Sequence, residues 1–333
     1  MEHDMKSPGN SYTSKCTSVA QLLRALCAIS FLLGASLPAF GLPPELPLWE
    51  KPPVDPPIRT DVKEQVRFAD PQLGSPSGSN RVFSSVSSPT YSIHRPPHPN
   101  SVGLVICPGG GFRDVWLDRE GHDLAIWLKA HNVTSLVLKY RTFVASDKGP
   151  ANTWANTLRA AEEDARQAVR VLRQRASALQ LDPSKIGICG FSAGGQLALK
   201  CALYAEPKPP EGEVSAMPDF AGLFYPGIPD DVRQVMAKRR ASGPAATGIC
   251  PFFMMNASDD TVTPADKCVE FYASLLRAGV KAELHVFGKG SHGFDLGTGR
   301  GKSLAMWPAS FAAWLGDSNL IGQSDATRTM KSE

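Results

Sequence analysis

The sequence lacks the charge pattern of a nucleic-acid-binding protein. Its 35 lysines and arginines nearly balance 32 aspartates and glutamates, and the formal net charge is +3. The basic residues form no run, and the sequence has no internal repeat. Binding to a phosphate backbone requires a concentrated basic face. We therefore expect no nucleic-acid partner.

Patterns that hold metal ions or cofactors are also missing. The sequence has no H-E-x-x-H motif and no comparable cluster of ligands. Asp118, Glu120 and His122 are close together, but their polarity predicts a helix start and an exposed surface. The sequence predicts neither a metal site nor a cofactor.

Closely spaced cysteines are absent as well. None of the seven cysteines forms a C-x-x-C pair, and Cys16 and Cys27 lie in an N-terminal segment that we expect to be removed. The other five are an odd number, and several lie in apolar runs, where a free thiol packs as a small hydrophobe. We expect free cysteines. One disulfide stays open as an alternative, because sequence does not select the pair.

The chain has no apolar run of the roughly 20 residues that span a bilayer. Near the N-terminus, Lys15 and Arg24 precede an apolar run at 25–37, and small residues follow at 39–41. This pattern is typical of a signal peptide, here 1–41. A buried helix or a short membrane anchor are the alternatives. We expect a secreted or periplasmic protein without stable membrane insertion after signal removal.

The rest of the chain alternates between strand and helix patterns. With 42% hydrophobic residues, it can bury a full core. The richness of residues 42–80 in Pro, Gly and Ser predicts an extended segment. We expect one folded domain at 81–318 and a disordered tail at 319–333. Apolar strands that alternate with helices predict an α/β fold with a mostly parallel, twisted sheet covered on both faces. The main strand candidates are 81–83, 90–94, 102–107, 135–138, 185–189, 220–225, 252–256 and 282–287, and the helix candidates are 121–130, 158–179, 196–203, 230–240, 264–279 and 307–315.

Residues 190–195 read Gly-Phe-Ser-Ala-Gly-Gly and match the G-x-S-x-G pattern of a nucleophile elbow. An apolar strand precedes them and a helix pattern follows. Small residues around Ser192 permit a strained turn that leaves the hydroxyl exposed. The pattern predicts that Ser192 is a nucleophile.

A run of three glycines, Gly109 to Gly111, follows the apolar run 102–107. Without side chains, such a backbone can approach a ligand closely and hold a developing oxyanion with its N–H groups. A phosphate-binding loop is disfavoured, because no Gly-Lys-Ser/Thr follows. A flexible turn is the remaining alternative.

An acidic residue and a histidine follow the serine in the order typical of a hydrolytic triad. His292 lies between glycines after the last strand, whereas His285 and His122 lie within a strand and a helix and are interpreted as structural. Asp260 has the preferred spacing after its strand, with Asp259 as the alternative. A serine hydroxyl needs a neutral imidazole as base, and a carboxylate orients that imidazole.

These motifs together resemble the α/β-hydrolase esterases that include acetylxylan and other carbohydrate acetyl esterases, near the dienelactone-hydrolase-like and hormone-sensitive-lipase-like groups. The similarity covers about 81–316 and rests on motifs at 107–112, 120–121, 125–128, 138–141, 190–195, 258–262 and 290–294. It implies an oxyanion hole from Gly110, Gly111 and Ala193 and little or no cap. Pro108 replaces the histidine of the H-G-G-G form, which points away from the lipase-like branch.

The resemblance implies a serine esterase that deacetylates carbohydrate such as xylan through an acyl-enzyme. Its partners would be a small ester or an acetylated polysaccharide. A lipase is disfavoured, because the only lid candidate, 230–240, is short. A peptidase-like serine hydrolase of the same fold, or a binding protein without catalysis, remains the alternative.

Overall fold

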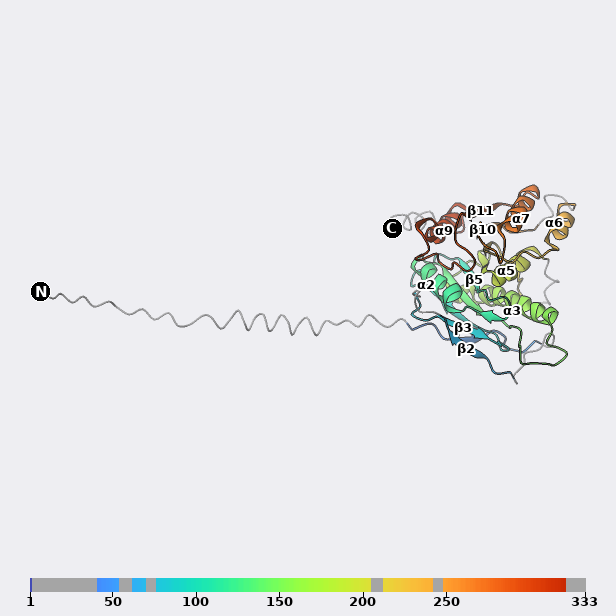
Figure 1. The fold of residues 1–333 in the computed structure, drawn as a ribbon, viewed down its shortest axis with the longest axis horizontal. Helices are drawn as coiled ribbons and strands as arrows, with labels where there is room; N and C mark the ends of the chain where they lie inside the picture. Colours follow the sequence, from blue (N-terminus) through green and yellow to red (C-terminus); the bar gives the residue numbers. More distant parts are fainter. Residues whose placement is uncertain (2–40, 54–61, 70–75, 205–211, 242–247, 322–333) are drawn as a thin grey trace. The chain divides into compact units, whose positions relative to one another are not determined.

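The apolar runs of the sequence form the strands of a large sheet in the computed structural model (Figure 1). The structure describes residues 1, 41–53, 62–69, 76–204, 212–241 and 248–321. Among these, the main sheet has eight strands, in the spatial order β1 (Leu46–Pro47), β4 (Thr90–His94), β7 (Thr134–Lys139), β5 (Gly103–Cys107), β8 (Ile186–Phe191), β9 (Ala221–Phe224), β10 (Phe252–Ala257) and β11 (Ala282–Phe287).

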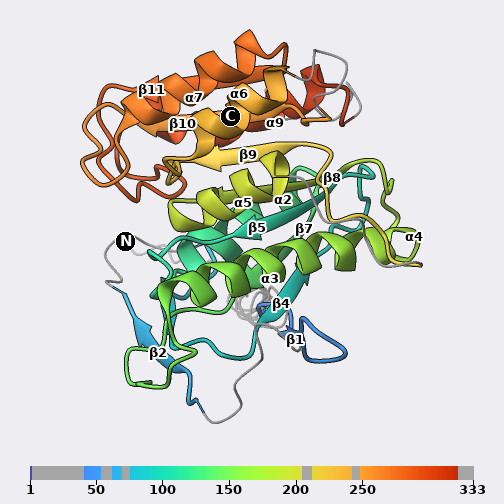
Figure 2. The ribbon, with the colours of Figure 1, turned by 90° about the vertical axis from the view of Figure 1, so that its right-hand side faces the viewer.

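The sheet is mostly parallel. From β7 to β11 all neighbouring strands run in the same direction. At the other edge, β4 pairs with β7 in the antiparallel direction, and β1 pairs with β4 in the same way. Every residue of β5 and β8 is buried, as expected for strands covered on both faces. Figure 2 shows the strands following one another from β1 to β11. The predicted fold class is confirmed.

Helices cover both faces of this sheet. In Figure 1, α2 and α9 lie on one side of the strands, and α3, α5 and α7 lie on the other. None of the helices in the described ranges combines the length and apolar composition needed to span a bilayer. The helices are α2 (Asp123–Ala130), α3 (Trp154–Gln174), α4 (Ala176–Leu179), α5 (Ala193–Leu203), α6 (Val232–Ala241), α7 (Ala265–Arg277), α8 (Lys302–Ala305) and α9 (Trp307–Asp317).

The proline-rich segment before Arg81 takes part in the fold where the structure describes it. Besides β1, it contributes β2 (Gln65–Phe68), which joins β3 (Arg81–Ser84) and β6 (Asp114–Val115) in a second, antiparallel sheet. The predicted signal peptide, except its end residues Met1 and Gly41, lies outside the described residues. The predicted tail 319–333 does so from 322 onward, whereas its residue Ile321 is buried against the core.

Polar contacts fasten this segment to the central strands. The indole Nε1 of Trp49 donates to Asp164, whose carboxylate also pairs with Arg141 in the interior, with an N–O distance of 2.8 Å in each case. Lys139 at the end of β7 pairs with both Glu45 and Glu64, again at 2.8 Å. The segment is therefore held by strand pairing and by ion pairs.

Aromatic side chains fill the core beside the elbow. Phe191, the last residue of β8, packs on Phe224 with ring centroids 4.8 Å apart, and Phe224 packs on Trp307 of α9 at 4.6 Å. All three side chains are fully buried. Each such burial contributes roughly 1.5–3 kcal/mol, so the strand end that carries the elbow has a rigid support.

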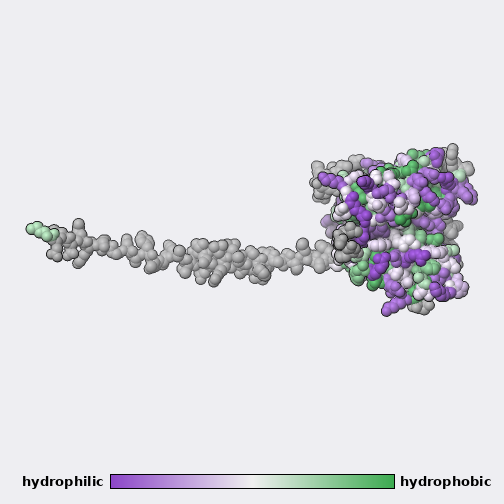
Figure 3. All heavy atoms as spheres, viewed as in Figure 1, coloured by the Kyte–Doolittle hydropathy of each residue, from purple (hydrophilic) through white to green (hydrophobic). Residues whose placement is uncertain are grey.

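The five cysteines in the described residues are free, as predicted, and no disulfide forms among them. Cys107, Cys189, Cys201 and Cys268 are buried, and burial raises the pKa of their thiols. They pack as small hydrophobes. On the face shown in Figure 3, hydrophilic and hydrophobic residues are interspersed.

Candidate active site

Ser192 lies in a sharp turn between β8 and α5. Its φ of 51° is unusual for a residue with a side chain, and its N–H donates to Phe224 O at 2.9 Å. A Cβ on Gly190 would lie 2.1 Å from Gly194 O, and a Cβ on Gly194 would lie 2.0 Å from Cys107 O. Only glycine fits both positions, which explains the G-x-S-x-G spacing.

The structure brings Ser192, His292 and Asp260 into one hydrogen-bonded line. His292 Nε2 lies 2.9 Å from Ser192 Oγ, and Nδ1 lies 2.8 Å from Asp260 Oδ2. The two contacts join residues 100 and 32 positions apart in the sequence. An imidazole protonated at Nδ1 donates to the carboxylate and leaves Nε2 to accept the serine proton.

Asp260 is kept as a carboxylate by its surroundings. Burial raises its pKa, but N–H donation from Thr263, the His292 ring and N–H donation from Val262 lower it, and the pKa lies below its ordinary value. The neighbouring Asp259 instead accepts from Gly290 N–H and Ser291 N–H, at 2.9 and 2.8 Å. The two aspartates thus differ in role: Asp260 contacts the imidazole, and Asp259 holds the loop that carries it.

Thr263 is part of the site, and the sequence analysis did not identify it. Its Oγ1 lies 2.9 Å from Asp260 Oδ2, 3.1 Å from His292 Nδ1 and 3.0 Å from Tyr225 O, to which it donates. The hydroxyl therefore links the acid, the histidine and the end of β9. Its place three residues after Asp260 was the only signal in the sequence.

The glycine run forms a turn beside Ser192. Gly110 has φ 133°, and a Cβ there would lie 2.1 Å from Asp114 O, so this position requires glycine. The N–H groups of Gly110 and Gly111 make no hydrogen bond with the described residues. Ala193 is the first residue of α5, where N–H groups also have no partner within the helix. These three donors are available for an oxyanion.

Glu120 is buried, although its polarity predicted an exposed position, and that prediction is wrong. It is 5% exposed and lies in a π-helical turn, Asp118–His122, that precedes α2. Its carboxylate accepts from Gly109 N–H at 2.6 Å and from the Tyr225 hydroxyl at 2.7 Å. Burial, with a smaller contribution from Asp295, raises the Glu120 pKa to about 7. The side chain supports the glycine turn from behind.

Asp118 and His122 are likewise buried, contrary to prediction. Asp118 accepts from the Arg81 backbone and guanidinium, at 2.7 and 2.8 Å. His122 Nδ1 lies 2.8 Å from His94 Nε2. These partners come from β3 and β4, so they compensate for burial in a way that local polarity does not reveal. The interpretation of His122 as a residue within a regular helix also changes, because α2 begins at Asp123.

A cavity of about 440 Å³ opens beside Ser192 and His292. Gly110, Gly111 and Glu120 line it, together with a wall of Trp116, Arg119, Asp295 and Arg300. Helix α6, within the lid candidate 230–240, does not line this cavity and packs instead on α7, with an ion pair between Arg233 and Glu270. Within the described ranges, no group of His, Cys, Asp and Glu is arranged to hold a metal ion.

Comparisons with known proteins bear on the fold and on the class of relatives. A family model described as alpha/beta hydrolase fold matches residues 155–242, which include the elbow. An acetylxylan esterase from Xylanibacter ruminicola is 26% identical over 224 residues, which is 61% of this chain and 43% of that protein. An endo-1,4-beta-xylanase B from Butyrivibrio fibrisolvens is 25% identical over 217 residues, covering 58% of this chain and 32% of its own length. The chain thus spans less than half the length of these curated relatives.

Solved structures show the same fold. An acetyl ester-xyloside bifunctional hydrolase from Caldicellulosiruptor lactoaceticus matches with a TM-score of 0.59 and 25% identity, over 84% of this chain and 99% of the other. A propionate-bound esterase from Thermogutta terrifontis matches with a TM-score of 0.56 and 20% identity, over 78% and 95% of the two chains. At 20% identity the likeness supports the fold alone.

Proposed function

We propose that this chain, which has the α/β-hydrolase fold, is a serine carboxylic ester hydrolase that removes acetyl groups from carbohydrate such as xylan. The observation that carries the proposal is the line of hydrogen bonds from Ser192 through His292 to Asp260, next to an open cavity. An elbow serine, an imidazole and a buried carboxylate in this arrangement suit acyl transfer.

In the proposed reaction, Ser192 Oγ attacks the acyl carbon while His292 Nε2 accepts its proton. The N–H groups of Gly110, Gly111 and Ala193 bind the oxyanion that forms, and the Asp260 carboxylate stabilises the imidazolium. His292 then returns the proton to the leaving alcohol, and an acyl-enzyme remains. Water, activated by the same imidazole, releases the acid.

Two observations favour a small acyl group on a bulky alcohol. The cavity is open and lacks a cover from α6, and relatives are named as an acetylxylan esterase and an acetyl ester-xyloside hydrolase. We also propose that the protein is secreted or periplasmic, on the basis of the N-terminal pattern at 15–41.

The test compares wild type with Ser192→Ala on p-nitrophenyl acetate and acetylated xylan. We expect kcat to fall by about 10⁴-fold or more, because the attacking group is removed. Ser177→Ala, at an exposed serine of α4, is the matched control and should leave kcat unchanged. Turnover retained by Ser192→Ala would contradict the proposed nucleophile.

Peptide amides and a fluorophosphonate probe, added to these two substrates, separate the two alternatives that the sequence left open. A peptidase-like hydrolase would cleave peptide amides better than acetyl esters. A binding protein without catalysis would leave every substrate intact and would not react with a fluorophosphonate probe. We expect acetyl ester hydrolysis and stoichiometric labelling of Ser192.

A further inference from the structure

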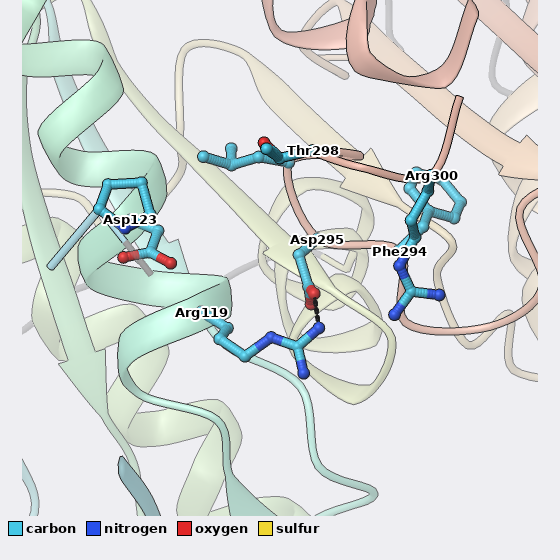
Figure 4. Close-up of a pocket in the computed structure, with 8 residues that line it drawn as sticks. Arg119, Asp123, Phe294, Asp295, Thr298 and Arg300 are labelled. Carbon is cyan, nitrogen blue, oxygen red and sulfur yellow. Dashed lines mark hydrogen bonds and ion pairs between the residues drawn. The ribbon is translucent and has the colours of Figure 1, made fainter. Parts of the chain in front are cut away.

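Three charged side chains form one wall of the cavity beside Ser192. Arg119, Asp295 and Arg300 line this cavity and also a smaller hollow next to it. Figure 4 shows both guanidinium groups pointing to the space beside the Asp295 carboxylate. None of the three side chains is hydrogen-bonded to Ser192, His292 or Asp260. They are therefore placed to contact a ligand without taking part in proton transfer.

Arg119 lines the cavity and is held in place by its neighbours. Its side chain is 11% exposed, forms an ion pair with Asp295 and lies over the Trp116 ring at 5.5 Å. Asp295 is the only hydrogen-bond acceptor of its guanidinium among the described residues. The guanidinium has five N–H donors, so several remain for a ligand or water. None of its nitrogens is a buried atom without a partner, so the donors that Asp295 leaves unused are accessible to a ligand or water.

Arg300 supplies a second guanidinium to the same wall. It is exposed, and its guanidinium makes no hydrogen bond or ion pair with the residues that the structure describes. The loop that carries it contains Gly297, Gly299 and Gly301, with φ of 73°, 75° and 121°. Such left-handed positions favour glycine, and the loop that contains them carries Arg300 at the lining of the cavity.

The wall thus has two guanidinium groups and one carboxylate, and that carboxylate is already paired with Arg119. We propose that Arg119 and Arg300 bind an anionic group, a carboxylate or a sulfate, on the carbohydrate that carries the ester. A planar guanidinium matches the oxygens of either anion with two parallel hydrogen bonds, which neutral hydroxyl groups cannot reproduce. The inference rests on the proposed function for the identity of the ligand as a carbohydrate ester.

The kinetic test uses a matched pair of substrates, an acetylated methyl glucuronoside and the corresponding acetylated methyl glucoside. We expect wild type to prefer the glucuronoside in kcat/KM, and Arg300→Gln to reduce this preference by about tenfold. Arg300→Lys keeps the charge and should reduce it less. Arg277→Gln, at an exposed arginine of α7 that does not line the cavity, is the control and should keep the preference. A preference for the neutral substrate, or equal changes on both substrates in Arg300→Gln, would overturn the proposal.

A binding test is independent of turnover. The probes are D-glucuronate, D-glucose 6-sulfate and D-glucose, titrated into wild type and Arg300→Gln and followed by NMR. We expect one or both anions to bind more tightly than glucose, and Arg300→Gln to weaken that binding; the better probe identifies the anion as carboxylate or sulfate. Equal binding of glucose, or binding unaffected by Arg300→Gln, would overturn the inference. If wild type hydrolyses no ester at all, the proposed function fails, and this titration still decides the anion site.

Discussion

Two histidines of this chain have Nδ1 at the same distance from a side-chain partner but lie in opposite surroundings. His292 Nδ1 lies 2.8 Å from Asp260 Oδ2, and His122 Nδ1 lies 2.8 Å from His94 Nε2. The His292 side chain is 22% exposed at the cavity, whereas His122 and His94 are 1% and 4% exposed. The two histidines therefore differ in their capacity for proton transfer, although their hydrogen bonds have the same length.

Electrostatics separates the two pairs. Burial, with the neighbouring His122 and Lys129 adding to it, lowers the pKa of His94 to about 3. Burial also lowers the pKa of His122 to about 4, even though Asp118 nearby acts in the other direction. A carboxylate in direct contact stabilises an imidazolium, and an imidazole partner does not. The comparison teaches that the partner and the access to solvent, more than bond length, determine which histidine can act as a base.

The comparison is tested most strongly by removing the charge behind His292. We expect Asp260→Asn to lower kcat for p-nitrophenyl acetate by about 10³–10⁴-fold, because an amide neither fixes the imidazole tautomer nor stabilises the imidazolium. Asp259→Asn is the matched control, since an amide oxygen can still accept from Gly290 and Ser291. It should retain kcat within about fivefold. Similar losses of kcat in both variants would mean that the carboxylate in contact with His292 does not determine the rate.

A smaller effect is expected at Glu120, whose partners are the glycine turn and Tyr225. Glu120→Gln keeps an acceptor for only one of the two donors. We expect kcat to fall about 10–100-fold with a smaller change in KM, because the oxyanion donors shift while the cavity keeps its shape. Tyr225→Phe should lower kcat in the same direction. Steady-state kinetics together with melting temperatures will show whether the loss is one of positioning; a change in stability alone would contradict it.

The last prediction concerns the stability of the fold, not activity, and the pair of buried histidines. Their pKa values in the folded state lie below the unfolded value of about 6.5, so the unfolded chain binds more protons as the pH falls. Stability is then fully present above about pH 6.5 and is lost as the pH falls toward 4, with a slope of up to about 1.4 kcal/mol per pH unit for each histidine.

We expect His94→Gln to reduce this slope, measured as the free energy of unfolding in urea between pH 7 and pH 4.5. His98→Gln, at an exposed position, is the control and should keep the slope of the wild type. An unchanged slope in His94→Gln would show that the buried pair does not govern acid stability.

Elements with a local signature could be predicted from the sequence. The apolar runs became strands, buried in the middle of the sheet, and the parallel sheet followed from their alternation with helices. The elbow was recognisable because steric contacts within a few residues, such as that between Gly190 and Gly194, require its spacing. These features depend on short-range geometry, which the order of residues determines directly.

Buried polar residues could not be predicted in this way. Glu120 and Asp118 were assigned to the surface because charged residues are seldom fully buried. Their partners, Tyr225 and Arg81, are 105 and 37 residues away in the sequence. Only the sheet order brings these groups together. The Glu-Gly pair after the glycine run was the one available signal, and it did not indicate burial.

The sequence by itself determined the α/β alternation, the strained serine turn and the glycine run, since each follows from steric limits and apolar periodicity along the chain. The tertiary structure decided that His292 contacts Asp260 rather than Asp259, that Glu120 supports the glycine turn, and that Arg119 and Arg300 share a wall of the cavity. The reason is physical. Hydrogen bonds and ion pairs act over a few ångströms, and strand order sets which distant residues come within that range.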